Sequence, residues 1–300
     1  MKRARPSTAD SQPSALRRGG ARRRLLQMGL TTLICAAGGE AFAREAGRIV
    51  RAALHSSAAE RRALIIGNAR YPGSPLRNPV NDARLIASTA GAIGFQVALH
   101  ENASRAEMLQ GLSDFLEDAD TAQVRLLYFA GHGACFRGRN FLLPVDVQIG
   151  PEEELPARAI DLQDITARLS RCSSGVNLLV FDACRTAAEV PGSRAQLRSL
   201  DGTRPVPRGS APMIPPQGTL VVFSTAPDQP ALDGAAGACG PFARHLAAEM
   251  TRIGVPIEVM LKRVRMAVMR ETGNRQVPWD SSSLAGEFCL AEFTGDPVRP

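Results

Sequence analysis

One histidine and one cysteine in this sequence each follow a strongly apolar segment. His132 lies between two glycines directly after the apolar run 124–130, and Cys184 closely follows a second apolar run at 176–181. A thiol needs a base or a positive neighbour to become a thiolate at neutral pH, and a neutral imidazole can take that proton and pass it to a leaving amine. This pair of residue types is therefore sufficient for acyl transfer.

The elements that must position His132 and Cys184 are strands of a predicted parallel sheet. Continuous apolar strands alternate with amphipathic helices, which predicts an α/β fold with a mostly parallel sheet covered on both faces. The strands are predicted at 63–67, 95–99, 124–130, 176–181 and 219–223, with a last one near 287–292, and the helices at 81–92, 104–117, 161–171, 241–252 and 256–271. Functional groups in such sheets gather beyond the carboxyl ends of the strands, where both residues fall.

The surroundings of the two residues favour chemistry over a structural role. A lone cysteine is often a small core residue, and a lone histidine at a strand end is often a satisfied structural group. Their joint placement at the ends of two strands favours a catalytic pair. The backbone N–H groups of Gly133 and Cys184 are then the candidate oxyanion donors. A metal site is not expected, because apart from Cys135 no further histidine or cysteine lies at ligand spacing.

Length and charge narrow the class of protein. The 300 residues, 44% of them hydrophobic, are enough to bury a full core. The net charge is +7, but residues 1–43 hold eight Lys/Arg against two acidic residues, so the remainder has 36 − 8 = 28 basic and 29 − 2 = 27 acidic groups. A nucleic-acid partner is therefore not expected, since it needs basic groups clustered on the folded body.

The N-terminal 43 residues have the layout of an export signal. A basic stretch ends at Arg24, an apolar run covers 25–37, and small residues follow at 41–43. The string at 21–27 resembles a twin-arginine signal, which predicts export to the periplasm. The apolar run is too short to cross a bilayer, so we expect no stable membrane span in the mature chain. The alternative is a disordered basic tail that leads into an ordinary first helix, on a cytoplasmic protein.

We therefore expect a signal at 1–43, a linker at 44–60, a folded catalytic domain at 61–292 and a tail at 293–300. Removal of the signal would leave five cysteines, an odd number, so at least one thiol is not paired within the chain. Disulfide pairing of the others and the oligomeric state stay open.

Residues 61–292 resemble the caspase-like clan of cysteine peptidases, family C14, which includes caspases, metacaspases, paracaspases and bacterial relatives. The resemblance rests on residues 128–133 (Tyr-Phe-Ala-Gly-His-Gly), on 181–185 (Phe-Asp-Ala-Cys-Arg) and on a histidine-to-cysteine separation of 184 − 132 = 52. Further matching stretches lie at 64–68, 76–83, 224–227, 231–234, 276–279 and 282–284. The resemblance implies a three-layer α/β/α caspase-hemoglobinase fold with about six strands, and His132 and Cys184 as its catalytic dyad.

The residue two positions before the nucleophile bears on specificity. Caspases carry glutamine there and cleave after aspartate, whereas the metacaspase and paracaspase branches carry aspartate and cleave after arginine or lysine. This chain has Asp182, and the resemblance also implies that Asp82 lines the S1 pocket. A partly buried carboxylate pair is strained by repulsion and relieved by a guanidinium, which favours P1 arginine over lysine. Asp82 can also serve as a helix N-terminal carboxylate, and both roles are compatible.

The expected partners are protein or peptide substrates with arginine or lysine at P1. No cofactor is expected, although the calcium requirement of some metacaspases stays open. Residues 185–217 hold five arginines among Pro, Gly and Ser, which fits a self-cleaved activation loop or a plain flexible substrate loop. Two other functions compete with an active peptidase: an inactive caspase-like binding scaffold, and a thiol redox sensor using Cys135 and Cys184. Retention of both His132 and Cys184 favours the enzyme.

Overall fold

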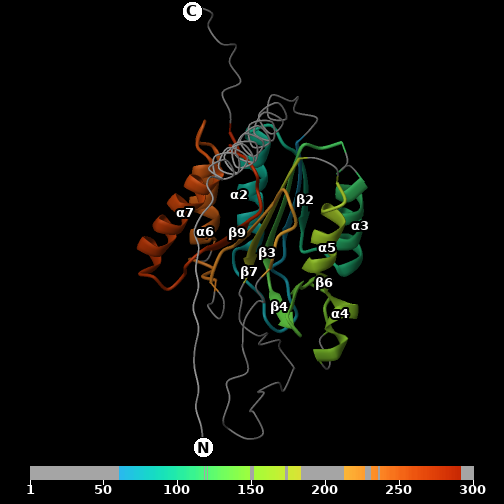
Figure 1. Cartoon of the computed structure of the whole chain (residues 1–300). Coiled ribbons are helices and arrows are strands. Elements are labelled where there is room, and N and C mark those ends of the chain that lie inside the picture. The colour runs from blue at the N-terminus through green and yellow to red at the C-terminus, as the bar shows by residue number, and fades with distance from the viewer. Residues whose placement is uncertain are drawn as a thin grey trace, which may run out of the picture. The chain divides into compact units, whose positions relative to one another are not determined.

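The computed structural model describes residues 61–117, 119, 121–148, 152–172, 175–183, 213–226, 231–235 and 237–291. A six-stranded sheet with the order β2-β1-β3-β7-β8-β9 forms its centre, and helices cover both faces (Figure 1). The predicted three-layer α/β fold is confirmed. The expected signal, the linker, Cys184, most of the 185–217 loop and the C-terminal tail lie outside the described residues.

Five parallel strands and one antiparallel strand make up the main sheet. They are β1 (Arg61–Gly67), β2 (Gln96–Glu101), β3 (Val124–Gly131), β7 (Val176–Ala183) and β8 (Thr219–Phe223), with β9 (Trp279–Ser282) antiparallel to β8. The central strands β3 and β8 are buried throughout, and β7 is buried except at Asp182. This agrees with their continuous apolar sequences, since helices shield both faces of a parallel sheet.

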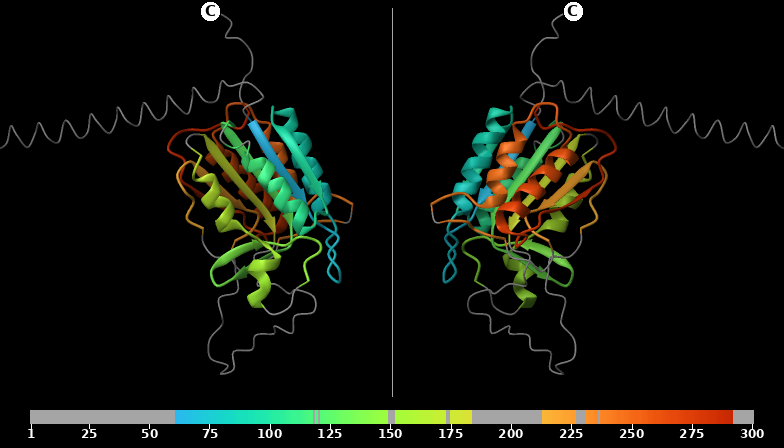
Figure 2. Two further views of the ribbon diagram at one scale, coloured as in Figure 1. Left: turned by 90° about the vertical axis from the view of Figure 1, so that its right-hand side faces the viewer. Right: turned by 90° about the vertical axis from the view of Figure 1, so that its left-hand side faces the viewer.

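Helices form two layers, one on each face of the sheet (Figure 2). Helices α2 (Pro79–Ala92), α6 (Pro241–Met250) and α7 (Ile257–Thr272) contribute to one core, and α3 (Arg105–Glu117) and α5 (Leu162–Leu169) to the other. Alternate residues of each strand enter opposite cores: Leu126 and Tyr128 face the α2 side, whereas Leu127 and Phe129 face the α3 side.

A small antiparallel sheet beyond the end of β3 was not predicted. It consists of β4 (Gly133–Phe136), β5 (Arg139–Leu142) and β6 (Ile160–Asp161), followed along the chain from β5 by a 3-10 turn (Glu152–Glu154) and α4 (Leu155–Arg158). Its strands are too short for a clear period-2 pattern. A third apolar cluster joins Phe141 of this sheet to Tyr71 and Leu143. The segment directly after His132 is therefore a strand of the small sheet and packs in this cluster.

The last strand was predicted in the wrong place. Strand β9 occupies Trp279–Ser282, whereas the segment near 287–291 makes isolated bridges with residues beside α7, Pro256 to Cys289 and Ile253 to Ala291. Phe288 and Leu290 are buried in the core on the α2 side. Their alternation with more polar residues reflects the burial of this segment against the core, whereas the strand paired with β8 lies at Trp279–Ser282. Helix α2 also begins two residues earlier than predicted, with Pro79 in its first turn.

None of the helices in the described part of the chain combines the length and apolarity needed to cross a membrane.

Candidate active site

His132 follows β3 directly and is held by Tyr71. The His132 backbone N–H donates to Tyr71 Oη at 3.0 Å, and the Tyr71 hydroxyl donates to Leu143 O at 2.9 Å. The two rings lie with centroids 4.5 Å apart. A Cβ at Gly131 would lie 2.5 Å from Tyr71 Oη, so this close approach requires glycine before the histidine. Burial raises the pKa of Tyr71, which therefore stays a neutral hydroxyl.

The His132 ring is oriented by Ser74. Its Nε2 lies 2.9 Å from Ser74 O and 3.2 Å from Ser74 Oγ. A carbonyl oxygen can only accept a hydrogen bond, so this contact assigns the proton of the neutral ring to Nε2. Nδ1 is then the nitrogen with a lone pair, and it is the one that can act as a base.

The pairing of β3 with β7 brings the two predicted strand ends together. Gly131 pairs with Ala183 and Ala130 pairs with Asp182 in parallel register. The residues that immediately precede His132 and Cys184 are therefore side by side. Cys184 itself lies outside the described residues, which end on this strand at Ala183.

Gly133, one predicted oxyanion donor, begins β4 opposite Leu142. Leu143 N donates to His132 O at 3.0 Å. His132 and Leu143 are the next pair along from Gly133 and Leu142. In an antiparallel ladder hydrogen-bonded and non-hydrogen-bonded pairs alternate, so Gly133 and Leu142 form a non-hydrogen-bonded pair. The Gly133 N–H therefore points away from β5 and is not used by the ladder. The second predicted donor, the Cys184 N–H, lies outside the described residues.

Asp82 and Asp182 meet on the α2 side of the sheet. Asp82, in the first turn of α2, is only 4% exposed, and its Oδ1 accepts from Gly240 N at 2.7 Å, at the start of α6. Asp182 follows Val180 by two residues, so its side chain lies on the same face of β7 as that core residue. Its Oδ2 accepts from the Tyr128 hydroxyl at 3.2 Å.

The electrostatics of the two carboxyl groups are coupled. Burial raises the pKa of Asp82 to about 8, and the charge of Asp182 adds to the rise. Burial likewise raises the pKa of Asp182 to about 6, while the hydroxyl groups of Ser224 and Tyr128 oppose the rise. Such a pair titrates together, and at neutral pH it holds about one proton. Within the described part of the chain, neither carboxyl group has an ion-pair partner.

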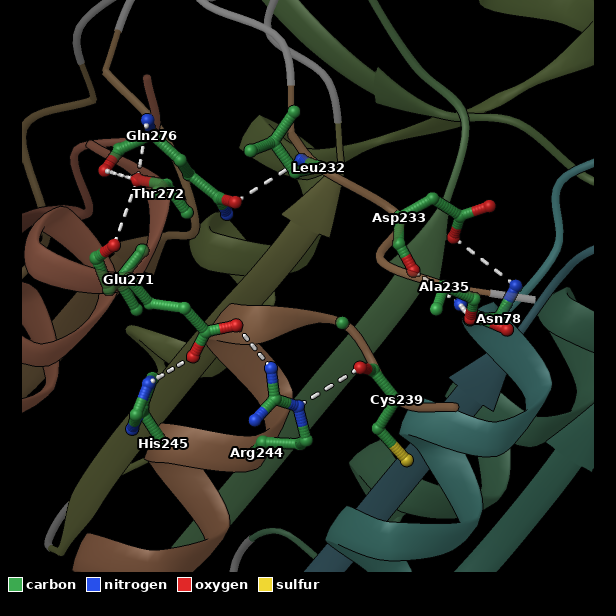
Figure 3. A network of polar contacts seen from close by, with 12 residues as sticks. Asn78, Leu232, Asp233, Ala235, Cys239, Arg244, His245, Glu271, Thr272 and Gln276 are labelled. Carbon is green, nitrogen blue, oxygen red and sulfur yellow. Dashed lines mark hydrogen bonds and ion pairs between the residues drawn. The ribbon is translucent and has the colours of Figure 1, made fainter. Parts of the chain in front are cut away.

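A third carboxylate, Asp233, was missed from the sequence. Its charge raises the pKa values of both Asp82 and Asp182, so it lies near them. Its carboxylate accepts from the backbone N–H of Arg77 at 2.6 Å, just before α2. It also accepts from the backbone N–H of Asn78 at 3.2 Å (Figure 3). The available signal was an acidic residue in the matching stretch 231–234, but nothing local indicated which way it faces. The arrangement of three carboxyl groups is suited to binding a cationic side chain.

The described cysteines do not form a second reactive site, and the described His, Cys, Asp and Glu residues do not form a metal site. Cys239 shares a hydrogen bond with Asp82, and burial together with that carboxylate raises the pKa of its thiol, which disfavours the reactive thiolate. Cys135 lies in β4, but its proposed redox partner Cys184 falls outside the described residues. Among the residues that the structure covers, no group of three or more His, Cys, Asp or Glu is arranged to hold a metal ion.

Comparison with known proteins places this chain in a family. The model of the caspase domain family matches residues 60–289. Human mucosa-associated lymphoid tissue lymphoma translocation protein 1 is 30% identical over 124 residues, which cover 41% of this chain and 15% of the human protein. Its mouse homolog is also 30% identical over 124 residues, with 41% of this chain and 14% of the mouse protein covered. The match to the family model spans most of the chain, and the chain therefore belongs to the caspase domain family, peptidase family C14.

Proposed function

We propose that this protein is a cysteine endopeptidase that cleaves peptide bonds after arginine, and less efficiently after lysine. Cys184 is the nucleophile and His132 the base. The observation that carries this proposal is the pairing of Gly131 with Ala183. Consecutive Cα atoms are about 3.8 Å apart, so each reactive residue begins one peptide unit beyond a paired position.

The orientation of His132 supports its role as the base. With Nε2–H donating to Ser74 O, Nδ1 accepts the proton of the Cys184 thiol. The thiolate attacks the P1 carbonyl carbon, and the imidazolium then gives its proton to the leaving amine as the peptide C–N bond breaks. Water, deprotonated by the same nitrogen, hydrolyses the acyl-enzyme and restores the thiol.

The Gly133 N–H supports stabilisation of the tetrahedral intermediate. Because its position in the β4–β5 pairing leaves it outside the ladder, it is available to donate to the oxyanion. The Cys184 N–H is proposed as the second donor. Two donors at an oxyanion contribute to catalysis because they bind the charge that develops only in the transition state.

The three carboxyl groups support a basic P1 residue. Asp82 and Asp182 are held close together without a cation among the described residues, and Asp233 adds its negative charge. A guanidinium presents five N–H donors in a fixed planar fork, so it can bond more than one carboxylate at once. An ammonium group satisfies the charge but not the planar geometry, which gives the expected order of arginine above lysine.

The direct test is hydrolysis of matched fluorogenic peptides with P1 Arg, Lys or Asp by the full chain, with and without calcium. We expect turnover of the Arg peptide, weaker turnover of the Lys peptide, and loss of both in Cys184→Ala and His132→Ala. Efficient cleavage after Asp would refute the role of the carboxylates. Folded wild-type protein that cleaves none of the peptides under either condition would favour the inactive scaffold instead.

A further inference from the structure

Gln276 is a fully buried amide that no step of the proposed reaction uses. It lies between the end of α7 and β9, and its side chain is 0% exposed. Its Nε2 donates to Ser224 O at 3.0 Å. Its Oε1 accepts from Leu232 N at 3.2 Å (Figure 3). One side chain therefore bonds the backbone at Ser224, directly after β8, and the backbone at Leu232, eight residues further along the chain.

The two partners of Gln276 each adjoin one of the carboxyl groups. Ser224 N donates to Phe181 O at 2.9 Å, one residue before Asp182, and the Ser224 side chain lowers the pKa of Asp182. Leu232 is the residue before Asp233. Gln276 thus connects the backbone beside Asp182 with the backbone beside Asp233.

The backbone of Gln276 is itself held by α7. Its N–H donates to Thr272 Oγ1 at 3.2 Å, and the Thr272 hydroxyl donates to Val268 O at 2.8 Å within the helix. Because the helix supplies this anchor, the amide has a defined position from which to reach Ser224 and Leu232.

A second contact from the end of α7 also reaches the chain between β8 and α6. Glu271 bonds Arg244 and accepts from His245 Nε2 at 2.7 Å, and Arg244 Nε donates to Cys239 O at 3.2 Å (Figure 3). Cys239 precedes Gly240, whose N–H binds Asp82. Gln276 and Glu271 therefore connect α7 with the chain between β8 and α6 at two places, at Leu232 beside Asp233 and, through Arg244, at Cys239. The exposed contact is expected to contribute less than the buried amide.

We propose that Gln276 is a positioning residue for the carboxylate pocket, which sets the spacing of Asp182 and Asp233 and thereby the preference for arginine over lysine. This inference rests on the proposed function. A guanidinium bonds several oxygens in a fixed plane, whereas an ammonium is a compact charge on a flexible stem. Loosening the spacing between the carboxylates should therefore weaken arginine binding more than lysine binding.

The test compares Gln276→Met with Asn177→Leu, each in the full chain carrying Cys184→Ala. Methionine keeps the approximate shape of glutamine but neither hydrogen bond. Asn177 is a matched control, because it is also buried and its amide also makes two hydrogen bonds, at the opposite end of β7 and β8: it donates to Thr219 Oγ1 at 3.2 Å and accepts from Arg125 Nη1 at 3.2 Å. Affinities for labelled peptides with P1 Arg or Lys are measured by fluorescence anisotropy, and thermal unfolding is recorded for each variant.

We expect Gln276→Met to weaken Arg-peptide binding by about tenfold, the effect of losing one to two buried hydrogen bonds, and Lys-peptide binding by about threefold or less. Asn177→Leu should lower the melting temperature while leaving the Arg-to-Lys affinity ratio unchanged. In the chain that retains Cys184, Gln276→Met should raise KM with little change in kcat.

An unchanged Arg-to-Lys ratio in folded Gln276→Met, or an equal change in the Asn177→Leu control, would overturn the inference. Selective Arg-peptide binding without turnover by wild-type protein would contradict the peptidase proposal but leave the comparison of Gln276 and Asn177 decisive. Absence of Arg-selective binding in the Cys184→Ala parent would overturn both proposals.

Discussion

Binding of a P1-arginine peptide should strengthen steeply as pH rises from 6 to 8. The cause lies in Asp82, whose pKa burial and the charge of Asp182 raise to about 8. In the free protein this carboxyl group is largely protonated at neutral pH. A guanidinium favours the ionised form, so binding must release a proton, and affinity rises with pH wherever the free protein still holds that proton.

The size of the effect follows from the fraction of Asp82 that is ionised. For a pKa of about 8, that fraction is about 1% at pH 6, about 9% at pH 7 and about 50% at pH 8. If tight binding requires the carboxylate, the dissociation constant falls by about 50-fold between pH 6 and pH 8. The arginine side chain does not titrate in this range, so the dependence belongs to the protein.

The assay is peptide binding to the full chain carrying Cys184→Ala, followed by fluorescence anisotropy from pH 5.5 to 9. Binding is measured in place of turnover because the rate also depends on proton transfer during the reaction. The number of protons released is measured by calorimetry in buffers with different ionisation enthalpies. Asp82→Asn is the matched control, since an amide oxygen can still accept from Gly240 N. Its binding should be weaker, with a much shallower slope between pH 6 and 8.

Two results would refute this reasoning. Affinity that is flat or falls between pH 6 and 8 would mean that the carboxyl group does not need to ionise for binding. An equal slope in Asp82→Asn would assign the titration to another group near the site, and Asp182, whose pKa burial raises to about 6, is the candidate.

Three further predictions concern stability, orientation of the base and self-cleavage. Because the folded-state pKa of Asp82 lies above its ordinary value of 3.8, folding stability is lost as pH rises from about 4 to 8, so Asp82→Asn should raise the melting temperature more at pH 8 than at pH 5. Tyr71→Phe leaves the His132 N–H and Leu143 O without this hydroxyl, and should lower kcat by at least about tenfold with KM little changed, at a stability loss of about 1–3 kcal/mol by urea unfolding. A rise in KM as large as the fall in kcat would contradict the role of Tyr71 in positioning His132. Prolonged incubation should produce cuts after arginine within 185–217 in the wild-type chain and none in Cys184→Ala, as read by intact mass, and an uncut wild-type chain would refute self-cleavage.

Much of the fold could be predicted because apolar continuity is a local signal. The runs at 124–130 and 176–181 became β3 and β7, and the alternating helices cover both faces as expected. The prediction failed for Trp279–Ser282, which is polar apart from Trp279 and forms an edge strand beside β8. An edge strand needs little apolar character, so its composition does not distinguish it from a loop.

The candidate site was predictable to the level of residue types and strand ends. The residues around His132 and Asp182 could be recognised from the chain because each follows or ends a buried strand. The role of Asp233 could not, because its contacts with Arg77 and Asn78 join positions about 155 residues apart. The same holds for Gln276, whose partners Ser224 and Leu232 are 52 and 44 residues away in the chain.

The sequence by itself determined the parallel α/β architecture, the order of the five parallel strands along the chain and the placement of His132 and Asp182 at carboxyl ends, because these depend on apolar runs and glycines within short segments. Only the tertiary structure decided that Gly131 pairs with Ala183, that Ser74 O orients His132 Nε2, and that α2 carries Asp82 to the face of β7 that bears Asp182. Strand register and helix placement are set by packing between distant segments, and that packing also produces the burial that raises the pKa values of the carboxyl groups.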